Sequence, residues 1–295
     1  MRLVVLSRSR NLHSTRRLVE EARKLNVEVL VANPLRCKLV TGSGGAKIFL
    51  GYHCLDSVDV VIPRIGTSIT EYGLLVVRQF ESMNVPVVNK SDAILNSRNK
   101  FRAFQSCAKH KNITMPITAM ARSLSDVPSL LKLAGGKFPM VIKLLQGAQG
   151  IGVMIGHDRS SVESILATLL GYEKETMLQQ YVRESGGSDV RVLIIGGKVI
   201  AAMRRRAKRG EFRANIHRGG WGEEIKRLPK SYERMALAAA KAVGLDIAGV
   251  DLLESASGPK LLEINSSPGF QELEKATGIN VAEKMIRLAM RKAKK

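Results

Sequence analysis

The sequence predicts a chain of two parts, an α/β domain with a small parallel sheet followed by a larger α+β region. Its 295 residues are enough for about two domains at roughly 100–200 residues each. Over residues 1–90, short β-branched runs alternate with helical patterns, which is typical of β-α-β units. From about residue 115, strand pairs enclose glycine-rich turns, as in antiparallel hairpins.

The alternation of β-branched runs with helical patterns predicts each strand and helix of the first domain. Strands are expected at residues 3–7, 27–31, 58–63 and 85–89, with helices at 14–25 and 71–83. This order favours a parallel sheet covered by helices, because parallel neighbours need long crossovers. No G-x-G-x-x-G turn follows the first strand, which disfavours a dinucleotide-binding domain.

The remaining elements alternate helices with hairpins. Helices are expected at residues 125–133, 159–170, 230–243 and 280–292. Strands are expected at residues 139–145, 153–155, 177–182, 189–195, 198–203, 247–254 and 260–265. Strand pairs that enclose turns, with helices between them, indicate an α+β region built of hairpins.

Composition limits the class of protein and of partner. Lys and Arg number 47 against 26 Asp and Glu, a net charge of +21 that favours an anionic partner: nucleic acid, ribosome, anionic lipid, nucleotide or acidic peptide. Cys37, Cys54 and Cys107 form no C-x-x-C pair, so we expect neither disulfides nor thiolate zinc but a reducing cytoplasm. We expect no signal peptide and no membrane partner, since every apolar run is too short.

Three oxygen-bearing side chains come together in the last predicted hairpin. Glu263 and Asn265 project from one side of a strand because strand side chains alternate between faces. The neighbouring antiparallel strand can bring Asp251 alongside them. Oxygen ligands without His or Cys suit a hard cation such as Mg²⁺. The alternative is a half-solvated polar face, but the apolar residues between these three already supply a buried face.

A glycine-rich loop at residues 146–152 separates two predicted strands. Its backbone N–H groups could approach phosphates closely, although an ordinary hairpin turn has the same composition. Lys143 lies among apolar residues of the strand that enters this loop. Such a lysine needs an anionic partner, for which phosphate is suited, unless it lies on a solvated edge.

An arginine-rich segment spans residues 204–218, with Glu211 as its single acidic residue. Arginine is suited to planar recognition of carboxylates and phosphates, and an RNA-binding loop would have the same composition. The chain is only 4% aromatic and has no aromatic signature of an RNA-recognition sheet. The pattern therefore favours ligand recognition over nucleic acid, and no sequence-specific nucleic-acid partner is expected.

Together these motifs resemble those of the ATP-grasp carboxylate–amine ligases over essentially the whole chain. The resemblance rests on Lys100, Lys143, the 147–152 loop, Gln179-Gln-Tyr-Val182, Asp189-Val-Arg191, Arg213-Ala-Asn215, Asp251, Glu263 and Asn265. Four longer motifs resemble the RimK family more narrowly: Pro63-Arg-Ile-Gly66, Arg205-Arg-Ala-Lys208, His217-Arg-Gly-Gly220 and Glu263-Ile-Asn-Ser-Ser-Pro-Gly269. The fold implied is an ATP-grasp fold preceded by a pre-ATP-grasp domain, with boundaries at 1–95, 96–185 (lid and hinge) and 186–295 (metal site).

The resemblance also implies residue roles. ATP would be bound by Lys100, Lys143, Gly147, Gly150, Gly152, Gln180, Tyr181, Val182, Asp189, Arg213, Ala214 and Asn215. Two Mg²⁺ or Mn²⁺ ions would be bound by Asp251, Glu263 and Asn265, and the catalytic residues would be Arg206, Arg213 and Asn215. Gln180 stands where many relatives have an acidic residue. The side-chain contact to adenine is therefore not implied, but a backbone contact is.

The activity implied is ATP-dependent formation of an amide bond through an acyl phosphate. L-Glutamate would be added to the carboxyl terminus of ribosomal protein S-six or another acidic peptide. Poly-α-glutamate would be a further product. The enzyme would be a homo-oligomer, a tetramer as in relatives. One alternative keeps the ligase with another acidic amino acid or acceptor, such as aminoadipate on a carrier protein or glutamate on a cofactor. The other is a ribosome- or RNA-binding protein without ligase activity.

Overall fold

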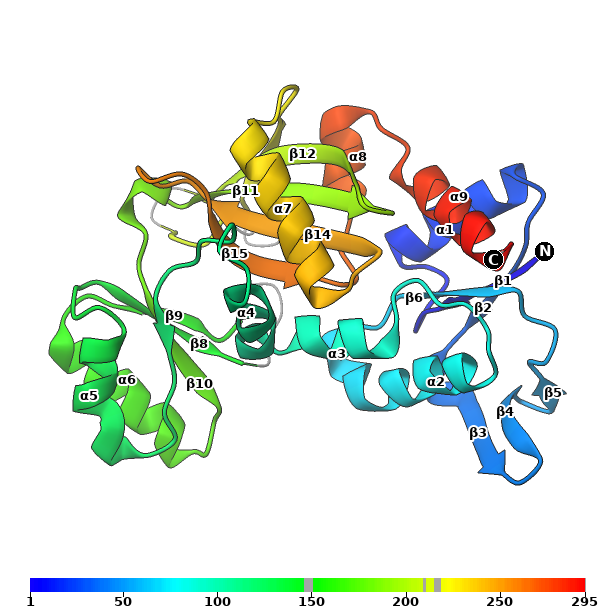
Figure 1. Cartoon of the computed structure of the whole chain (residues 1–295), viewed down its shortest axis with the longest axis horizontal. Helices are drawn as coiled ribbons and strands as arrows, with labels where there is room; N and C mark the ends of the chain where they lie inside the picture. Colours follow the sequence, from blue (N-terminus) through cyan, green and yellow to red (C-terminus); the bar gives the residue numbers. More distant parts are fainter. Residues whose placement is uncertain (146–150, 209–210, 215–218, 295) are drawn as a thin grey trace.

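The computed structural model describes residues 1–145, 151–208, 211–214 and 219–294. Within these ranges the strands form a parallel sheet, a small satellite sheet, a four-stranded sheet and a five-stranded sheet (Figure 1). No helix in the described ranges is long and apolar enough to cross a membrane.

The N-terminal domain contains a three-stranded parallel sheet with helices on both faces. Its strands lie in the order β2-β1-β6 and its helices flank them: β1 (Arg2–Leu6), β2 (Glu28–Ala32), β6 (Val60–Pro63), α1 (His13–Lys24), α2 (Thr70–Ser82) and α3 (Ser91–Arg98). Leu3 and Val5 face one core with Leu18 of α1, whereas Val4 and Leu6 face another with Phe80 of α2. Burial of both faces explains why β1 is a continuous apolar run.

Two features of this domain differ from the prediction. The strand expected at residues 85–89 is a single parallel bridge between Val61 and Val87, because Pro86 has no N–H with which to extend a ladder. An unpredicted antiparallel sheet is formed by β3 (Cys37–Gly42), β4 (Gly45–Leu50) and β5 (His53–Cys54). Only Cys37 and Ile48 are buried in its two longer strands, so the sequence there has no hydrophobic alternation.

The middle of the chain forms a four-stranded antiparallel sheet with two helices on one face. The elements are β7 (Thr118–Ala119), β8 (Met140–Leu144), β9 (Val153–Gly156), β10 (Thr176–Gln180), α5 (Val127–Leu133) and α6 (Arg159–Gly171). Met140, Ile142 and Leu178 pack under these helices. The alternate residues Val141, Lys143 and Gln179 therefore point away from the helices, and they line a cavity.

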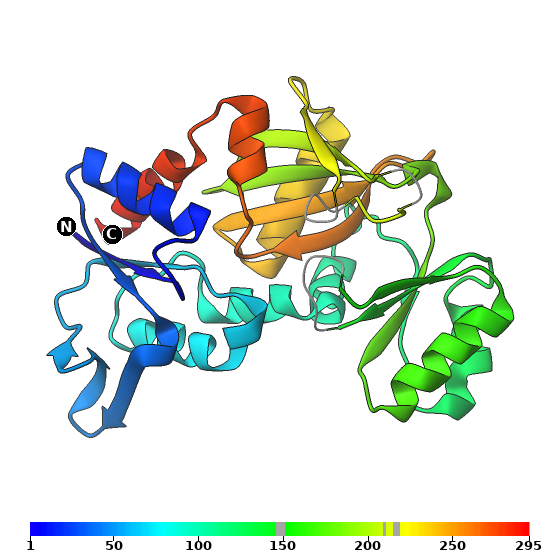
Figure 2. The ribbon, with the colours of Figure 1, turned by 180° about the vertical axis from the view of Figure 1, so that it is seen from behind.

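The C-terminal part is built on a five-stranded antiparallel sheet in the order β13-β12-β11-β14-β15. Its elements are β11 (Ser188–Ile195), β12 (Lys198–Arg206), β13 (Trp221–Glu224), β14 (Ile247–Leu253), β15 (Lys260–Asn265), α4 (Lys100–Ala108), α7 (Lys230–Val243), α8 (Gln271–Thr277) and α9 (Val281–Ala293). Helix α7 and α4 cover one face, and α8 and α9 lie on the side of the N-terminal domain (Figure 2). The strand β13 and the helix α8 were not predicted.

Two helices connect the three predicted regions. Helix α4 packs on α7 and β15, although it falls within the predicted region 96–185. Helix α9 returns from the end of the chain to pack on α1 and β6, which brings the two termini close together (Figure 1). The hydrophobic cores of the first and last regions are consequently continuous through α9.

Candidate active site

A cavity of about 720 Å³ lies where the three parts of the chain meet. It is lined by the N-terminal domain, by the face of the four-stranded sheet that carries Lys143, and by the five-stranded sheet. Its volume lies in the range of roughly 300–1,000 Å³ that is typical of ligand sites. Eleven of the residues predicted from the sequence line it: Lys100, Lys143, Gln180, Tyr181, Val182, Asp189, Arg213, Ala214, Asp251, Glu263 and Asn265.

The predicted metal residues are brought together by strand register. Asp251 pairs directly with Glu263 across β14 and β15, and Asn265 lies one step further along the same face, opposite Gly249. The side-chain nitrogen Nδ2 of Asn265 is buried and has no hydrogen-bond partner within the described chain. Among the described residues no cluster of three or more His, Cys, Asp or Glu could hold a metal, and this site combines two carboxylates with one amide. The carboxylate and amide oxygens of these three residues fit a hard cation, whereas the free Nδ2–H of Asn265 can donate to an oxygen of a bound ligand.

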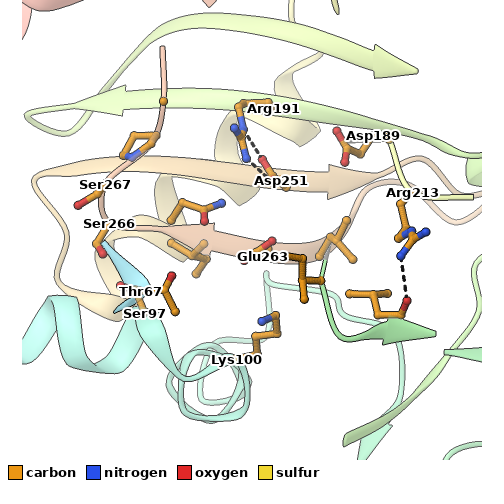
Figure 3. A pocket seen from close by; sticks show the side chains of 18 of the residues that line it. Thr67, Ser97, Lys100, Asp189, Arg191, Arg213, Asp251, Glu263, Ser266 and Ser267 are labelled. Carbon is orange, nitrogen blue, oxygen red and sulfur yellow. Dashed lines mark hydrogen bonds and ion pairs between the residues drawn. The ribbon is translucent and has the colours of Figure 1, made fainter. Parts of the chain in front are cut away.

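A buried network of charges connects this trio to the neighbouring strands. Arg191 donates to both oxygens of Asp251, from Nε at 2.8 Å and from Nη2 at 2.7 Å (Figure 3). Arg205 forms a bidentate pair with Asp189, with both N···O distances at 2.6 Å, and also donates to Asp251 at 2.8 Å. Asp189 and Asp251 are therefore bridged by a single guanidinium group. A carboxylate has about four lone-pair positions, so Asp251 retains acceptor capacity for a cation.

The network sets the charge of both aspartates. Burial raises the pKa of Asp189 to about 6, against the attraction of Arg205. Burial also acts on Asp251, but Arg191 and Arg205 together hold the pKa of its carboxyl below the ordinary value. Asp251 thus remains ionised, as a metal ligand must be.

Lys143 faces the cavity from the opposite sheet. Its Nζ donates to Oε1 of Gln179 at 2.7 Å, and Gln179 in turn donates to Thr118 at 2.8 Å. Burial, with help from Lys100 and against Glu263, lowers the pKa of Lys143 to about 8. A buried ammonium with one neutral partner is stabilised by an incoming anion, so phosphate is favoured over the solvated-edge alternative.

The predicted arginines of the 204–218 segment differ in position. Arg213 lines the cavity, where it donates to Val153 O at 3.3 Å and forms a bidentate pair with Glu211. Arg206 does not line it: its side chain is 43% exposed and pairs with Glu223. Strand alternation explains this, because Arg205 shares the inward face of β12 with buried Met203 and so turns Arg206 outward.

Four predicted glycine and asparagine positions need separate mention. Gly147, Gly150 and Asn215 lie outside the described residues. Gly152 is absent from the lining, but its neighbours Ile151 and Val153 contribute to it. The positive φ of Gly152, +74°, and the close approach of Leu144 both exclude a Cβ there.

Comparison with known proteins identifies the family. Residues 97–289 match the RimK-like ATP-grasp domain, and residues 1–94 match the RimK PreATP-grasp domain. The chain belongs to the RimK-like ATP-grasp family. This membership confirms the predicted fold and the predicted class of enzyme, an ATP-dependent ligase.

Relatives of this RimK-like chain are found both in sequence and in structure. A probable alpha-L-glutamate ligase of Marinobacter nauticus is 48% identical over 259 residues, which cover 88% of this chain and 85% of the relative. The RimK domain protein ATP-grasp from Sphaerobacter thermophilus has a TM-score of 0.75 at 18% identity, covering 98% and 100% of the two chains. The ATP-grasp ligase PsnB, complexed with minimal precursor, Mg and ADP, has a TM-score of 0.75 at 19% identity, covering 100% and 98%. The two structures show the shared fold.

Sequence reasoning missed several residues of this RimK-like cavity. Arg205 and Gln179 appeared only within motifs, because the sequence does not show which face of β12 is turned toward the cavity. The lining from the N-terminal domain was given no role: Arg64 appeared only within the motif Pro63-Arg-Ile-Gly66, and Arg98 only as one of several basic residues. No local pattern identifies those two arginines, because their meeting depends on how β6 and α3 pack against the end of β15.

Proposed function

We propose that this chain is an ATP-dependent ligase that joins L-glutamate through amide bonds to the carboxyl terminus of an acidic peptide, with ribosomal protein S-six as the first acceptor to test. The observation that carries the proposal is the cavity in which Asp251, Glu263 and Asn265 face Lys143. It is supported by the name of the 48% identical relative, a probable alpha-L-glutamate ligase. The net charge of +21 suits an acidic acceptor.

In this mechanism the chain mainly positions reactants and balances charge. Lys143, with Lys100 and Arg213, binds the phosphates of ATP, while the segment Gln180–Val182 contacts the adenine. Asp251, Glu263 and Asn265 would hold Mg²⁺ or Mn²⁺, two ions in our proposal. When bound, the metal neutralises phosphate oxygens as a Lewis acid.

The reaction itself needs no side-chain nucleophile. The acceptor carboxylate attacks the γ-phosphorus, ADP leaves, and an acyl phosphate forms. The glutamate amine then attacks the acyl carbon, phosphate leaves with the electrons of the C–O bond, and the amine loses a proton. A cavity enclosed by three parts of the chain limits access of water, which would otherwise hydrolyse the acyl phosphate.

The test is mass spectrometry of S-six after incubation with the chain, ATP, Mg²⁺ and glutamate, with ADP release followed in parallel. A ladder of glutamate additions is expected. ADP release without a ladder would redirect the search to another acceptor or acidic amino acid. The absence of both would contradict the ligase. Size-exclusion chromatography with light scattering tests the tetramer, and a cytoplasmic location, which the scattered cysteines favour, is tested by cell fractionation.

A further inference from the structure

Buried polar atoms without a partner gather at one end of the cavity. Within the described residues, seven side-chain nitrogen or oxygen atoms are buried and accept or donate no hydrogen bond. Five of the seven belong to residues that line the cavity: Arg64, Arg98, Asn265, Ser266 and Ser267. Buried polar atoms are nearly always hydrogen-bonded in folded proteins, so such a concentration calls for a specific cause.

The two arginines are held in place by their outer nitrogens. Arg64 follows β6, and its Nη2 donates to Pro268 O at 2.8 Å. Arg98 ends α3 and donates to Ile65 O and, at 3.3 Å, to the hydroxyl of Thr67. The Nε of each arginine is buried and unsatisfied, so each guanidinium is fixed in place with a buried donor still available.

Charge at this end of the cavity is also unbalanced. Neither Arg64 nor Arg98 has a carboxylate oxygen within 4.0 Å among the described residues. Burial and the neighbouring Arg98 lower the pKa of Arg64 to about 10, and burial lowers the pKa of Arg98 as well, against the attraction of Glu263. Both groups are still cationic at neutral pH. Two half-buried like charges with buried Nε atoms destabilise the free protein and favour the arrival of an anion.

Hydroxyl groups complete the same end. Ser266 and Ser267 directly follow Asn265 of the metal trio, and Ser266 is only 4% exposed. Figure 3 shows both serines beside Thr67 and Ser97, at the opposite end of the cavity from Arg213, with Glu263 between the two ends. Guanidinium and hydroxyl donors around an enclosed space suit a carboxylate.

We propose that Arg64, Arg98, Ser266 and Ser267 bind a carboxylate of the incoming L-glutamate. The inference rests on the proposed function, and it names the part of the cavity that holds the amino acid to be added. An amino acid bound at this end is separated from Arg213 by Glu263. Its amine can therefore point toward the middle of the cavity, where the acyl phosphate would form. The enclosed hydroxyls favour a small free amino acid over the chain of an acceptor peptide, whose acidic end is the other source of a carboxylate.

The experiment measures L-glutamate directly as well as through turnover. Arg64→Met and Arg98→Met remove a charge at similar volume, and Arg78→Met is the matched control, since Arg78 is exposed and pairs with Asp92. Calorimetry on the full chain with ADP and Mg²⁺ gives the Kd of L-glutamate. Initial rates of ADP release give KM for glutamate, for the acceptor peptide and for ATP.

Each cavity variant is expected to raise the Kd and KM of glutamate by about 10- to 100-fold, the value of a charge-assisted hydrogen bond. KM for ATP and for the peptide should stay within about twofold, as should every constant of Arg78→Met. Arg64→Lys, which keeps the charge and loses the planar fork, should fall between the wild type and Arg64→Met.

The melting temperature distinguishes a loss of glutamate binding from a loss of fold stability. Removing a half-buried charge that has no ion-pair partner should leave the melting temperature of the free chain unchanged or raised, while the stabilisation by added L-glutamate disappears. A glutamate KM unchanged in both variants, or a rise in the peptide KM instead, would overturn the subsite while the ligase stands. A wild-type chain that neither binds L-glutamate nor releases ADP would overturn the proposed function as well.

Discussion

Buried charge is arranged in opposite ways on two walls of the cavity. On the wall formed by β11, β12 and β14, the buried carboxylates Asp189 and Asp251 are paired with guanidinium groups at 2.6–2.8 Å. On the wall next to the N-terminal domain, Arg64 and Arg98 each keep a buried Nε without a partner. The first wall is charge-balanced, since two arginines face two aspartates, whereas the second carries two arginines without an ion-pair partner among the described residues.

The difference separates what stabilises the fold from what is available to a ligand. Paired charges fix the orientation of Asp251 before any metal arrives, as surrounding partners of metal ligands commonly do. Unpaired charges reduce the stability of the free protein and increase its affinity for an anion. One wall of the cavity is therefore held in place by its own ion pairs. On the other wall, the buried donors obtain hydrogen-bond partners only when substrate binds.

The largest effect is expected from Glu263→Gln, which removes a metal charge without changing volume. Turnover should fall by about 10²- to 10³-fold, because loss of one stabilising group from a preorganised catalytic site costs about 3–4 kcal/mol. ADP release is measured against Glu223→Gln, an exposed glutamate that pairs with Arg206. A wild-type rate in Glu263→Gln, with the control equally active, would exclude this residue from the metal site.

Arg205→Met tests the paired wall directly. It leaves Asp189 and Asp251 as two buried carboxylates without their shared guanidinium, so the free energy of unfolding should fall by about 3–5 kcal/mol. Arg64→Met, the same substitution on the unpaired wall, should cost little. Urea unfolding of both variants gives the comparison. Equal losses in the two would show that the pairing does not distinguish the walls.

The sequence could predict this paired wall only in part. The alternation of β14 and β15 placed Asp251 beside Glu263 correctly, because register follows from the hydrophobic pattern of a half-buried hairpin. Arg205 and Arg206 were indistinguishable as neighbours in a run of arginines, and the choice between them depends on which face of β12 is buried. The unpaired wall could not be predicted, since it exists only where β6, α3 and the end of β15 meet.

The strand and helix predictions follow the same logic. Helix α7 lies where its apolar periodicity predicts, at Lys230–Val243. The small sheet of β3, β4 and β5 was missed because few of its side chains are buried, and the strand at 85–89 was wrong because apolar residues alone do not supply the missing N–H of Pro86. Local hydrophobic patterns indicate which residues are buried. They do not predict strands that bury few side chains or lack backbone hydrogen-bond donors.

A smaller effect is expected from pH, through Lys143. The free protein loses this proton near pH 8, whereas bound phosphates favour the ammonium, so ATP affinity should be full below pH 8 and fall by up to about tenfold per pH unit above it. Calorimetric Kd values for ATP between about pH 7 and 9.5 give the profile. Lys143→Arg stays cationic throughout and should have a flat profile. The same slope in this variant would assign the proton to another group.

The smallest effect is expected from Arg206→Ala. Its exposed pair with Glu223, at 3.3 Å, should contribute under about 1 kcal/mol to stability, and kcat/KM should stay within about twofold of wild type. Arg213→Ala is the counterpart, since that side chain lines the cavity and should lower kcat/KM by about 10- to 100-fold. Steady-state rates with glutamate and an acidic peptide measure both. A large loss in Arg206→Ala would restore the catalytic role that the sequence predicted, and would require β12 to present its outer face to substrate.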